Sequence, residues 1–498
     1  MIQKRKGFTM DYKKDFFFTD DHWGNLPTVR ITKIELNNFK SVKHGEIVLD
    51  CGKQYIPYGT KSDILGVYGQ NGSGKTSLIE ALSILEVLMS GGSVPDIYAD
   101  CISVDEDHST LVFTFDLQYP NGEIRELEYS FNMNKLKLTE DEIQERYKDA
   151  PENFQIPSEA YKVCIYDEVL KLSWQEDGKK KYKQPIIDTS TTDIPFGPTP
   201  KLKAFVEKDK AQILELGYIK KETSDKSRSF IFSKKTLQVF KDSNLYSIYF
   251  QILLEMRYYA CLFFFVIDTK SSGLIRLNFA LPIYTRSGMM HFFDVRRPET
   301  FPNEMFDYFN KSLSELSKVL TQLVPGLTIG FKRISEAITK EGEAGCIAEL
   351  MAYRDGMELP LRDESDGVRK IISVLSLIVA AYNDQSFTLA IDEFDAGVFE
   401  YLLGEILQTF EESGKGQFIF TSHNLRPLEV INKKFLVFTT TNPNNRYFRL
   451  KNIAATNNLR DTYFREIVLG EQEEQVYNKT KRFKIAAAMR KPRGSEST

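Results

Sequence analysis

The pattern of apolar and polar positions predicts an α/β fold with a mostly parallel sheet. Apolar runs of the length of a buried strand lie at 63–68, 387–391 and 417–420. Apolar residues recur at helical spacing over 78–88, 302–323, 368–381 and 399–410. Further strands are expected near 327–334 and 346–353. Because strand and helix alternate around the buried runs, we expect parallel strands with helices on both faces of the sheet.

The first part of the chain predicts a lobe of antiparallel strands. Residues 29–50 alternate at their start, and residues 109–132 alternate more strongly. Pro120-Asn121-Gly122 interrupts the second stretch as a turn. We therefore expect a hairpin within an N-terminal antiparallel β lobe.

Between the strand at 63–68 and the helix that follows, the sequence reads Gly-Gln-Asn-Gly-Ser-Gly-Lys-Thr. This is the spacing G-x-x-x-x-G-K-[ST], in which the glycines let the backbone direct several N–H groups at one anion. The start of the helix adds its positive dipole end. A turn of this kind predicts a phosphate-binding P-loop.

The residue types in this turn match the parts of a nucleoside triphosphate. Lys75 is placed to contact the β- and γ-phosphates, and the Thr76 hydroxyl is placed to bind Mg²⁺. We therefore predict ATP and Mg²⁺ as cofactors, against the alternative of a glycine-rich turn that arose by chance. The predicted phosphate-binding residues are Gly69, Asn71, Gly72, Ser73, Gly74, Lys75, Thr76 and Ser77.

Acidic residues follow the apolar strand at 387–391. Asp392 is placed for the Mg²⁺ shell, and Glu393 can orient and polarise an attacking water. His423 follows the next buried strand, where a neutral imidazole can bond the γ-phosphate or that water. The competing interpretations are a strand that ends in solvated acids and a structural histidine. We predict Glu393, His423 and Lys75 as the catalytic residues.

Two further motifs flank these acids. Ser365-Asp366-Gly367 precedes a long apolar helix and offers a hydroxyl and free N–H groups to an anion. The alternative is an ordinary helix cap. Asp395-Ala396-Gly397 follows Glu393 and is either a plain turn or a loop that contacts a second subunit.

These motifs, in this order, resemble the ABC-type ATPase heads of the SMC/RecF/OLD superfamily. The segment 31–42 resembles the first strand of those heads, and 69–76 has their usual P-loop wording. Ser365-Asp366-Gly367 and the segment 392–400 are closer to the stand-alone AAA-type ATPases of bacterial abortive-infection systems. The resemblance covers about 29–130 and 300–440.

The resemblance implies an ABC-type P-loop NTPase core that forms a homodimer, or a higher oligomer, with ATP between subunits. Ser365 and Gly367 would then contact the γ-phosphate held by the other subunit. Gln118, in the predicted hairpin, is the candidate for the glutamine that binds Mg²⁺ in such sites. The implied partner is a separate effector, a nuclease encoded by a second gene.

The composition changes between 133 and 300, where Lys179-Lys180-Lys181 and Lys183 form a basic run. The region from 175 to 241 is either a partner or sensor surface or a solvated lid face. The expected segments are an N-terminal arm (1–28), the first part of the ATPase core (29–132), an inserted α/β lid or arm domain (133–300), the second part of the core (301–460), and a C-terminal helix and basic tail (461–498).

Several features depart from the resembled families. The chain lacks the Leu-Ser-Gly-Gly-Gln of ABC transporters, and residues 133–300 contain no sustained heptads. Only 75 residues follow His423, and they contain no Asp-x-Asp pair. We therefore expect no nuclease activity in this chain.

Net charge and cysteine usage limit the cellular compartment and the kinds of partner that we expect. The net charge of −4 gives no global positive field for nucleic acid. The five cysteines are scattered without a C-x-x-C pair, which fits a reducing cytosol. The longest apolar run, 258–267, is too short to span a bilayer. We expect a cytoplasmic protein without a membrane partner.

Three functions fit these observations. The first is an ATP-hydrolysing switch that dimerises around nucleotide and controls a separate effector in anti-phage defence. The second is an SMC/RecF-like ATPase of DNA repair or recombination. The third is an ATP-binding scaffold with little turnover. Nucleic acid stays open as a partner.

Overall fold

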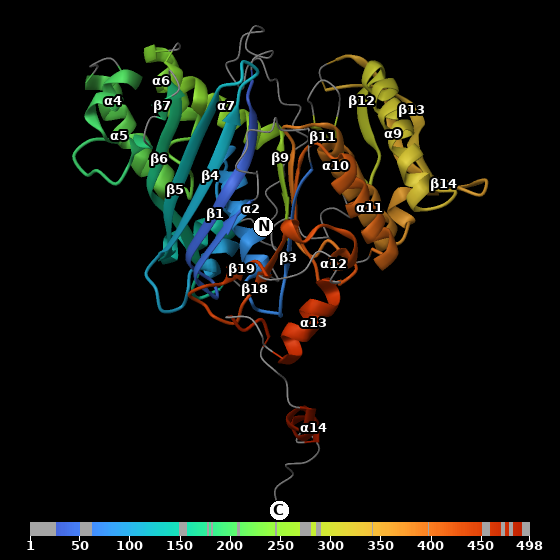
Figure 1. The fold of residues 1–498 in the computed structure, drawn as a ribbon. Helices are drawn as coiled ribbons and strands as arrows, with labels where there is room; N and C mark the ends of the chain where they lie inside the picture. The colour runs from blue at the N-terminus through green and yellow to red at the C-terminus, as the bar shows by residue number, and fades with distance from the viewer. Residues whose placement is uncertain are drawn as a thin grey trace, which may run out of the picture.

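Two large β-sheets organise the part of the chain that the computed structural model describes (Figure 1). The described residues are 26–49, 62–148, 157–176, 179–180, 183–206, 210–244, 247–268, 280–284, 290–340, 342–396, 398–450, 459–469, 474–477 and 482–490. The expected N-terminal arm lies outside them except for 26–28, and so do Gly397 and the end of the basic tail.

The central sheet has six strands in the order β19-β18-β3-β17-β16-β9. Every neighbouring pair is parallel except β18 and β19. The strands are β3 (Asp63–Tyr68), β9 (Phe264–Ile267), β16 (Thr388–Ile391), β17 (Gln417–Thr421), β18 (Leu436–Thr439) and β19 (Tyr447–Phe448). The predicted mostly parallel sheet is thus confirmed, and so are the predicted strands at 63–68, 387–391 and 417–420.

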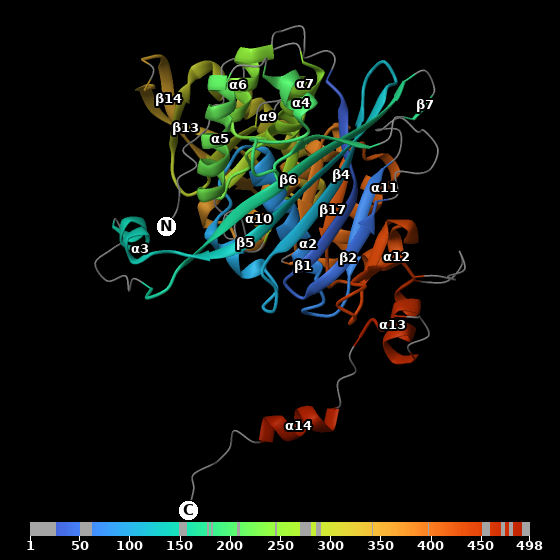
Figure 2. The ribbon, with the colours of Figure 1, turned by 90° about the vertical axis from the view of Figure 1, so that its left-hand side faces the viewer.

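Helices cover both faces of this sheet, as the alternation of side chains requires (Figures 1 and 2). In β3, Leu65 and Val67 belong to one hydrophobic core, while Ile64 and Tyr68 belong to the other. The first core contains α2 (Lys75–Met89) and α7 (Ile248–Leu262). The second contains α10 (Asp366–Asn383), α11 (Glu400–Ser413), α12 (Pro427–Val430) and α13 (Leu459–Leu469).

The second large sheet is an antiparallel lobe that packs on the opposite side of α2 from the central sheet (Figure 1). Its order is β2-β1-β4-β5-β6-β7, and β8 also pairs with β6. The strands are β1 (Thr28–Phe39), β2 (Val42–Val48), β4 (Ser109–Gln118), β5 (Ile124–Lys137), β6 (Tyr161–Glu176), β7 (Lys179–Lys180) and β8 (Gln184–Asp188). The predicted hairpin is confirmed as β4 and β5.

The structure divides the middle of the chain differently from the expected insert. The expected boundary between 132 and 133 falls inside β5, and β6 and β8 continue the same sheet. At the other end of that segment, β9 pairs with β16 in the central sheet. The rise in lysine content at 175–241 marks a change of surface charge and not the end of the lobe. Four helices lie in this segment before α7: α3 (Glu140–Tyr147), α4 (Thr199–Phe205), α5 (Lys210–Asp225) and α6 (Lys234–Asn244).

A smaller unit precedes α10. It joins α9 (Asn303–Leu323) to a four-stranded antiparallel sheet of β12 (Glu299–Pro302), β13 (Thr328–Ile338), β14 (Ala344–Arg354) and β15 (Met357–Pro360). The predicted helix at 302–323 and strands at 327–334 and 346–353 are confirmed. A separate pair, β10 (Ala280–Tyr284) and β11 (Met290–Asp294), shares their core. Because Ile372 and Leu375 join this core while Val374 and Leu377 face the central sheet, α10 is held between the two.

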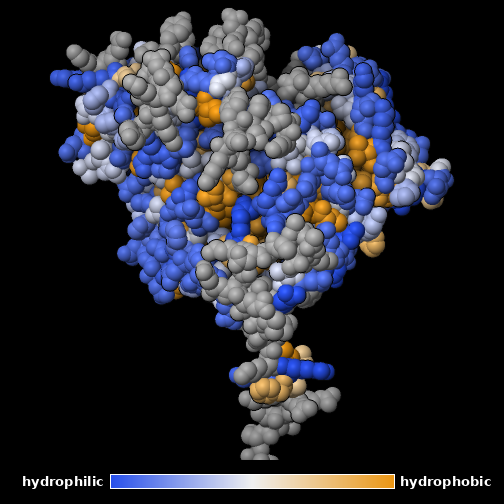
Figure 3. Space-filling model, viewed as in Figure 1, coloured by the Kyte–Doolittle hydropathy of each residue, from blue (hydrophilic) through white to orange (hydrophobic). Residues whose placement is uncertain are grey.

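The C-terminal helix α14 (Arg482–Arg490) stands away from the rest of the molecule in both views (Figures 1 and 2). Its Phe483 and Met489 side chains are exposed. Most of the face drawn in Figure 3 is hydrophilic, with smaller hydrophobic areas. No helix within the described ranges is both long enough and apolar enough to cross a membrane.

Candidate functional site

The P-loop connects the carboxyl end of β3 to the start of α2. Gly69, Gly72 and Gly74 have φ angles of 156°, 77° and 97°, which residues with a Cβ rarely adopt. A Cβ on Gly69 would lie 1.7 Å from Oγ1 of Thr439. The glycines of the motif are therefore required by the φ angles of these residues and by the close approach of Thr439 to Gly69, as the sequence motif predicts.

Lys75 is buried at the first position of α2. Its ammonium donates to the carbonyl oxygens of Gly69 at 2.8 Å and Gln70 at 3.1 Å. Burial lowers the pKa of Lys75, against the raising effect of Asp392 and other nearby carboxylates. A desolvated cation with only carbonyl partners is well suited to an anionic ligand.

The other predicted P-loop residues lie around this cation. Ser73 and Ser77 are buried, and Asn71 is exposed at the tip of the turn. The Ser73 hydroxyl donates to the Gln70 carbonyl at 2.5 Å. This bond closes the turn on itself.

The structure brings Thr76 and Asp392 together although 316 residues separate them in sequence. The Thr76 hydroxyl lies 3.4 Å from Oδ1 of Asp392, and the same oxygen accepts a bond of 2.6 Å from Oγ1 of Thr421. Oxygen atoms from a hydroxyl and a carboxylate are the ligands that Mg²⁺ prefers. Thr421 was not predicted as a site residue; its signal in the sequence is a polar residue at the end of a buried strand.

Glu393 follows Asp392 in a left-handed conformation, with φ of 48°. Its N–H donates to Oγ1 of Thr421 at 2.8 Å, and its carbonyl accepts from the Ala396 N–H at 2.9 Å. A non-glycine residue in this region is strained by roughly 1–3 kcal/mol, and such strain concentrates at functional sites. The surrounding bonds therefore fix the direction in which the Glu393 side chain leaves the backbone.

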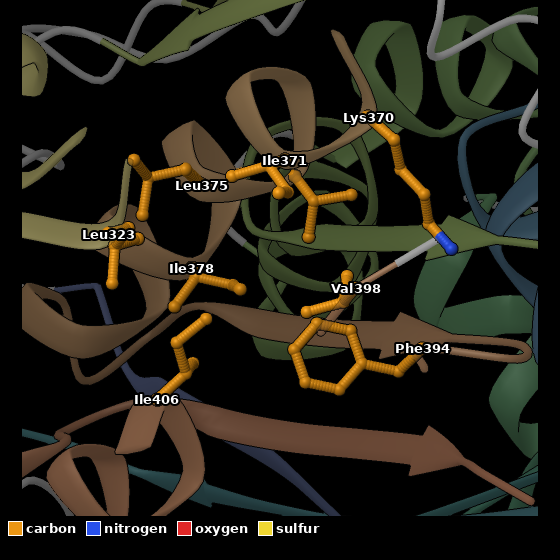
Figure 4. A pocket seen from close by; sticks show the side chains of 9 residues that line it. Leu323, Lys370, Ile371, Leu375, Ile378, Phe394, Val398 and Ile406 are labelled. Atoms are coloured by element: carbon orange, nitrogen blue, oxygen red, sulfur yellow. The ribbon is translucent and has the colours of Figure 1, made fainter. Parts of the chain in front are cut away.

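Lys370 is a further residue that the sequence analysis missed. It comes from α10, is buried, and donates to the carbonyl of Ala396 and, at 3.3 Å, to that of Glu393. Burial lowers its pKa to about 8, against the raising effect of Asp395 and Glu393. In Figure 4 its aliphatic stem lies beside an apolar groove lined by Phe394 and residues of α9, α10 and α11. The signal in the sequence that could have identified Lys370 was a lysine among the apolar residues of this helix.

His423 and the loop after Glu393 are joined through Asp395. The Asp395 carboxylate accepts from the backbone N–H groups of His423 at 3.1 Å and Asn424 at 3.0 Å. The His423 side chain is exposed. Gly397, the end of the predicted subunit-contacting loop, lies outside the described residues.

Ser365 caps the N-terminus of α10, where its hydroxyl accepts from the Val368 N–H at 3.3 Å. Ser365 and Asp366 are exposed, and Gly367 is half-buried. Among the described residues, no hydrogen bond joins Ser365 to the P-loop. The helix-cap interpretation thus holds within one chain, and the terminus that Ser365 caps is exposed.

The structure does not place Gln118 at this site. Gln118 pairs with Thr28 at the start of β1, whereas the other end of β1 approaches the P-loop through the Ser41 hydroxyl, which donates to Gly72 O at 3.1 Å. At about 3.3 Å per residue, the length of β1 separates these ends by more than 30 Å. The expectation failed because the hairpin is antiparallel, and its turn lies away from the P-loop.

The buried carboxylate of Asp268 lies beside Asp392, and this position was not predicted from the sequence. Asp268 follows β9, which pairs directly with β16. The Asp392 N–H donates to the carbonyl of Ile267 at 2.8 Å, and the Tyr98 hydroxyl donates to Asp268. The signal was the apolar strand 264–267, which the sequence analysis assigned to the insert.

The lysine-rich region is partly neutralised by the lobe on which it lies. Lys183 contacts Glu126 at 2.8 Å and Glu128 at 2.9 Å, and Lys171 contacts Glu128 at 2.9 Å. Lys181 lies outside the described residues. These ion pairs favour a solvated face over a continuous basic surface.

A P-loop at the end of one parallel strand, facing acids at the end of another, defines a P-loop ATPase. The profile of the AAA ATPase domain matches residues 30–426, so the chain belongs to this family. No curated protein matches the chain.

Solved structures with similarity to this chain include SMC head domains and the recombination mediator protein RecF. An SMC head domain from Pyrococcus furiosus, bound to the C-terminal domain of ScpA, has a TM-score of 0.39 at 13% identity, over 85% of this chain and 96% of that one. The SMC head domain from Thermotoga maritima has a TM-score of 0.34 at 11% identity, over 85% and 100%. The recombination mediator protein RecF with ATP has a TM-score of 0.32 at 13% identity, over 80% and 94%.

Proposed function

We propose that this chain is an ATP-hydrolysing molecular switch. It dimerises around nucleotide and controls a separate effector, a nuclease, in bacterial anti-phage defence. The observation that carries the ATPase part is the cluster of Thr76, Asp392 and Thr421, which sets metal-binding oxygens against the P-loop. The effector and the defence role are supported only by the wording of Ser365-Asp366-Gly367 and of segment 392–400.

The residues present fit both ATP and Mg²⁺. The left-handed glycines direct N–H groups into one turn, and the buried Lys75 ammonium lies beside them. Thr76 and Asp392 would hold Mg²⁺, which when bound neutralises charge on the β- and γ-phosphates. Lys75 would leave its carbonyl partners to contact the same phosphates.

Glu393 would hold the attacking water and accept its proton. Its strained backbone and its bonds to Thr421 and Ala396 support this role because they orient its side chain before substrate arrives. His423 would bond the γ-phosphate, in register with Glu393 through Asp395. The exposed N-terminus of α10 would supply Ser365 and Gly367 to the nucleotide of a second subunit.

The test is steady-state ATP hydrolysis with Mg²⁺ by the wild type and by Lys75→Ala. The matched control is Lys311→Ala, because Lys311 lies on the exposed face of α9. We expect hydrolysis to be lost in Lys75→Ala alone, with an unchanged circular dichroism spectrum. Normal turnover in Lys75→Ala would refute the site.

The partner model is tested by incubating the purified chain with ATP, Mg²⁺ and DNA or RNA. We expect no cleavage. Cleavage that a point mutation in this chain removes would contradict a separate effector. Hydrolysis that DNA stimulates would favour the repair alternative, and ATP binding without turnover would favour the scaffold.

A further inference from the structure

The P-loop is enclosed from its outer side by a hairpin that follows it in sequence by more than 360 residues. The hairpin comprises β18, β19 and the turn between them. Oγ1 of Thr439 forms a short hydrogen bond with the Ser73 hydroxyl, and the Tyr447 hydroxyl donates to the Gly74 carbonyl at 2.7 Å. Both contacts fall on residues of the phosphate-binding turn.

Arg446 fills the space between this hairpin and the P-loop. A Cβ on Gly74 would lie 3.2 Å from its Cγ, so the arginine stem packs directly against the turn. Its guanidinium donates to Thr440 O at 2.8 Å and to Ser41 O. The Ser41 hydroxyl in turn donates to Gly72 O, so Arg446 is linked to the P-loop directly at Gly74 and through Ser41 at Gly72.

The charge of Arg446 is the unusual feature of this contact. The residue is 5% exposed, and none of the described residues offers a hydrogen-bond partner to its Nε. Within the described part of the chain, its guanidinium bonds only carbonyl oxygens. Burial lowers its pKa. A buried cation without a carboxylate is costly unless an anion balances it, and bound triphosphate would supply that anion.

The hairpin is itself braced from outside by the segment 474–477. The Glu474 carboxylate accepts from the Asn445 side chain at 2.8 Å and from that of Asn442 at 3.2 Å. The Thr441 N–H donates to Gln475 O at 2.8 Å. These bonds hold both ends of the turn that carries Arg446.

We infer that the β18–β19 hairpin is a positioning element of the nucleotide site. Tyr447 and Arg446 hold the P-loop in its anion-binding conformation, Arg446 adds positive charge behind the phosphates, and Glu474 braces the hairpin. The inference rests on the proposed ATP site and extends it to residues outside the sequence motifs. Their contacts are to the P-loop and within the hairpin, so we expect their effect to fall on nucleotide affinity.

The test compares Tyr447→Phe, Arg446→Met, Arg446→Lys and Glu474→Ala with the wild type. Asn444→Ala is the matched control, because Asn444 is exposed in the same turn and its side chain makes no bond among the described residues. The measurements are the dissociation constant for ATP, KM, kcat and the thermal midpoint without nucleotide.

Tyr447→Phe removes one hydroxyl and keeps the ring, so we expect the ATP dissociation constant and KM to rise roughly 3- to 10-fold, as for one hydrogen bond. The value of kcat should stay within about 2-fold. Arg446→Met should raise both constants at least about 10-fold, and Arg446→Lys should restore part of the loss. Glu474→Ala should have the smallest effect of the four, and Asn444→Ala none.

Variants that melt at lower temperature yet bind ATP like the wild type would overturn the inference, because the hairpin would then serve folding alone. Unchanged affinity in Glu474→Ala would overturn the bracing role. If the wild type binds no ATP, the proposed function fails first. Binding by the wild type with unaltered affinity in Tyr447→Phe and Arg446→Met refutes only this inference.

Discussion

The two parts of the proposed nucleotide site are built in opposite ways. In the P-loop part, Thr76, Asp392 and Thr421 come from three elements and are joined by hydrogen bonds across the end of one sheet. In the other part, named here the signature part (Ser365-Asp366-Gly367), Ser365 is exposed, and its bonds among the described residues lie within the first turn of its own helix. The first part is assembled within one chain, whereas the second part is open to another surface.

Lys370 connects the two parts inside the chain. It lies five residues after Ser365 and donates to the carbonyls of Glu393 and Ala396. We therefore expect a shift of α10, caused by a partner at its N-terminus, to reach the strained loop that carries Glu393.

The largest expected effect is in the P-loop part, with Glu393→Gln. The amide keeps the shape but cannot accept a proton, so kcat should fall by about two to four orders of magnitude. ATP binding should persist, because the P-loop contacts are unchanged. Single-turnover hydrolysis and equilibrium ATP binding measure the two effects. Glu400→Gln, on the exposed start of α11, is the matched control and should behave as the wild type. Wild-type turnover in Glu393→Gln would mean that another residue holds the water.

Mixing two inactive chains tests whether the exposed part acts across subunits. Lys75→Ala and Ser365→Arg should each abolish hydrolysis, but a mixed dimer contains one site with an intact P-loop and an intact signature. An equal mixture should recover about a quarter of the wild-type rate, because half of the dimers are mixed and each has one working site. Activity that stays at zero, with mixed dimers confirmed by mass, would indicate a site complete within one chain.

The sequence predicted the P-loop part well because its residues are tied to local patterns. Glycine spacing, an apolar strand before Lys75 and acids after residues 387–391 are all short-range signals, and the structure places Thr76 beside Asp392 as expected. The parallel sheet was predicted from the alternation of apolar strands and helices along the chain. In this part of the site the local sequence patterns are consistent with the global fold, which is typical of sequences that fold to one structure.

The remaining contacts depend on tertiary arrangement that no short pattern contains. Gln118 lies at the start of the hairpin turn, and only the antiparallel register with β1 shows that this turn points away from the P-loop. Arg446 lies in a polar turn and Tyr447 begins β19, and neither belongs to a motif. Their proposed role depends on the pairing of β18 with β3. The apolar run 258–267 and the strand at 387–391 were both visible in the sequence, but the pairing of β9 with β16 was not.

A smaller effect is expected at Lys370, between the two parts. Its pKa of about 8 means that the ammonium loses charge as pH rises through that value, and its bonds to the carbonyls of Ala396 and Glu393 weaken. We expect kcat to fall about 3- to 10-fold above pH 8, the worth of one or two hydrogen bonds. Lys370→Arg keeps its charge and should move this decline to higher pH.

Stability should respond to the same group with the opposite sign. The unfolded lysine has a pKa near 10.4, so between about pH 8 and pH 10.4 the unfolded chain binds more protons. The contribution of Lys370 to the free energy of unfolding therefore rises with pH in this window, and Lys370→Met should remove that rise. If the pH profile of kcat is identical in the wild type and in Lys370→Arg, Lys370 does not influence the loop that carries Glu393.

At Ser365, a small effect on stability and a separate effect on hydrolysis distinguish a helix cap from a phosphate contact. Ser365→Ala removes the side-chain acceptor of the Val368 N–H and should lower the free energy of unfolding by about 1 kcal/mol. Asp is as good a cap as Ser, so Ser365→Asp should keep wild-type stability. Its negative charge would nevertheless face the γ-phosphate of the neighbouring subunit, and hydrolysis should be lost. Urea unfolding and ATPase assays on the same preparations measure both quantities. If Ser365→Asp is as active as it is stable, the exposed N-terminus of α10 is only a cap, and the nucleotide site needs no second subunit there.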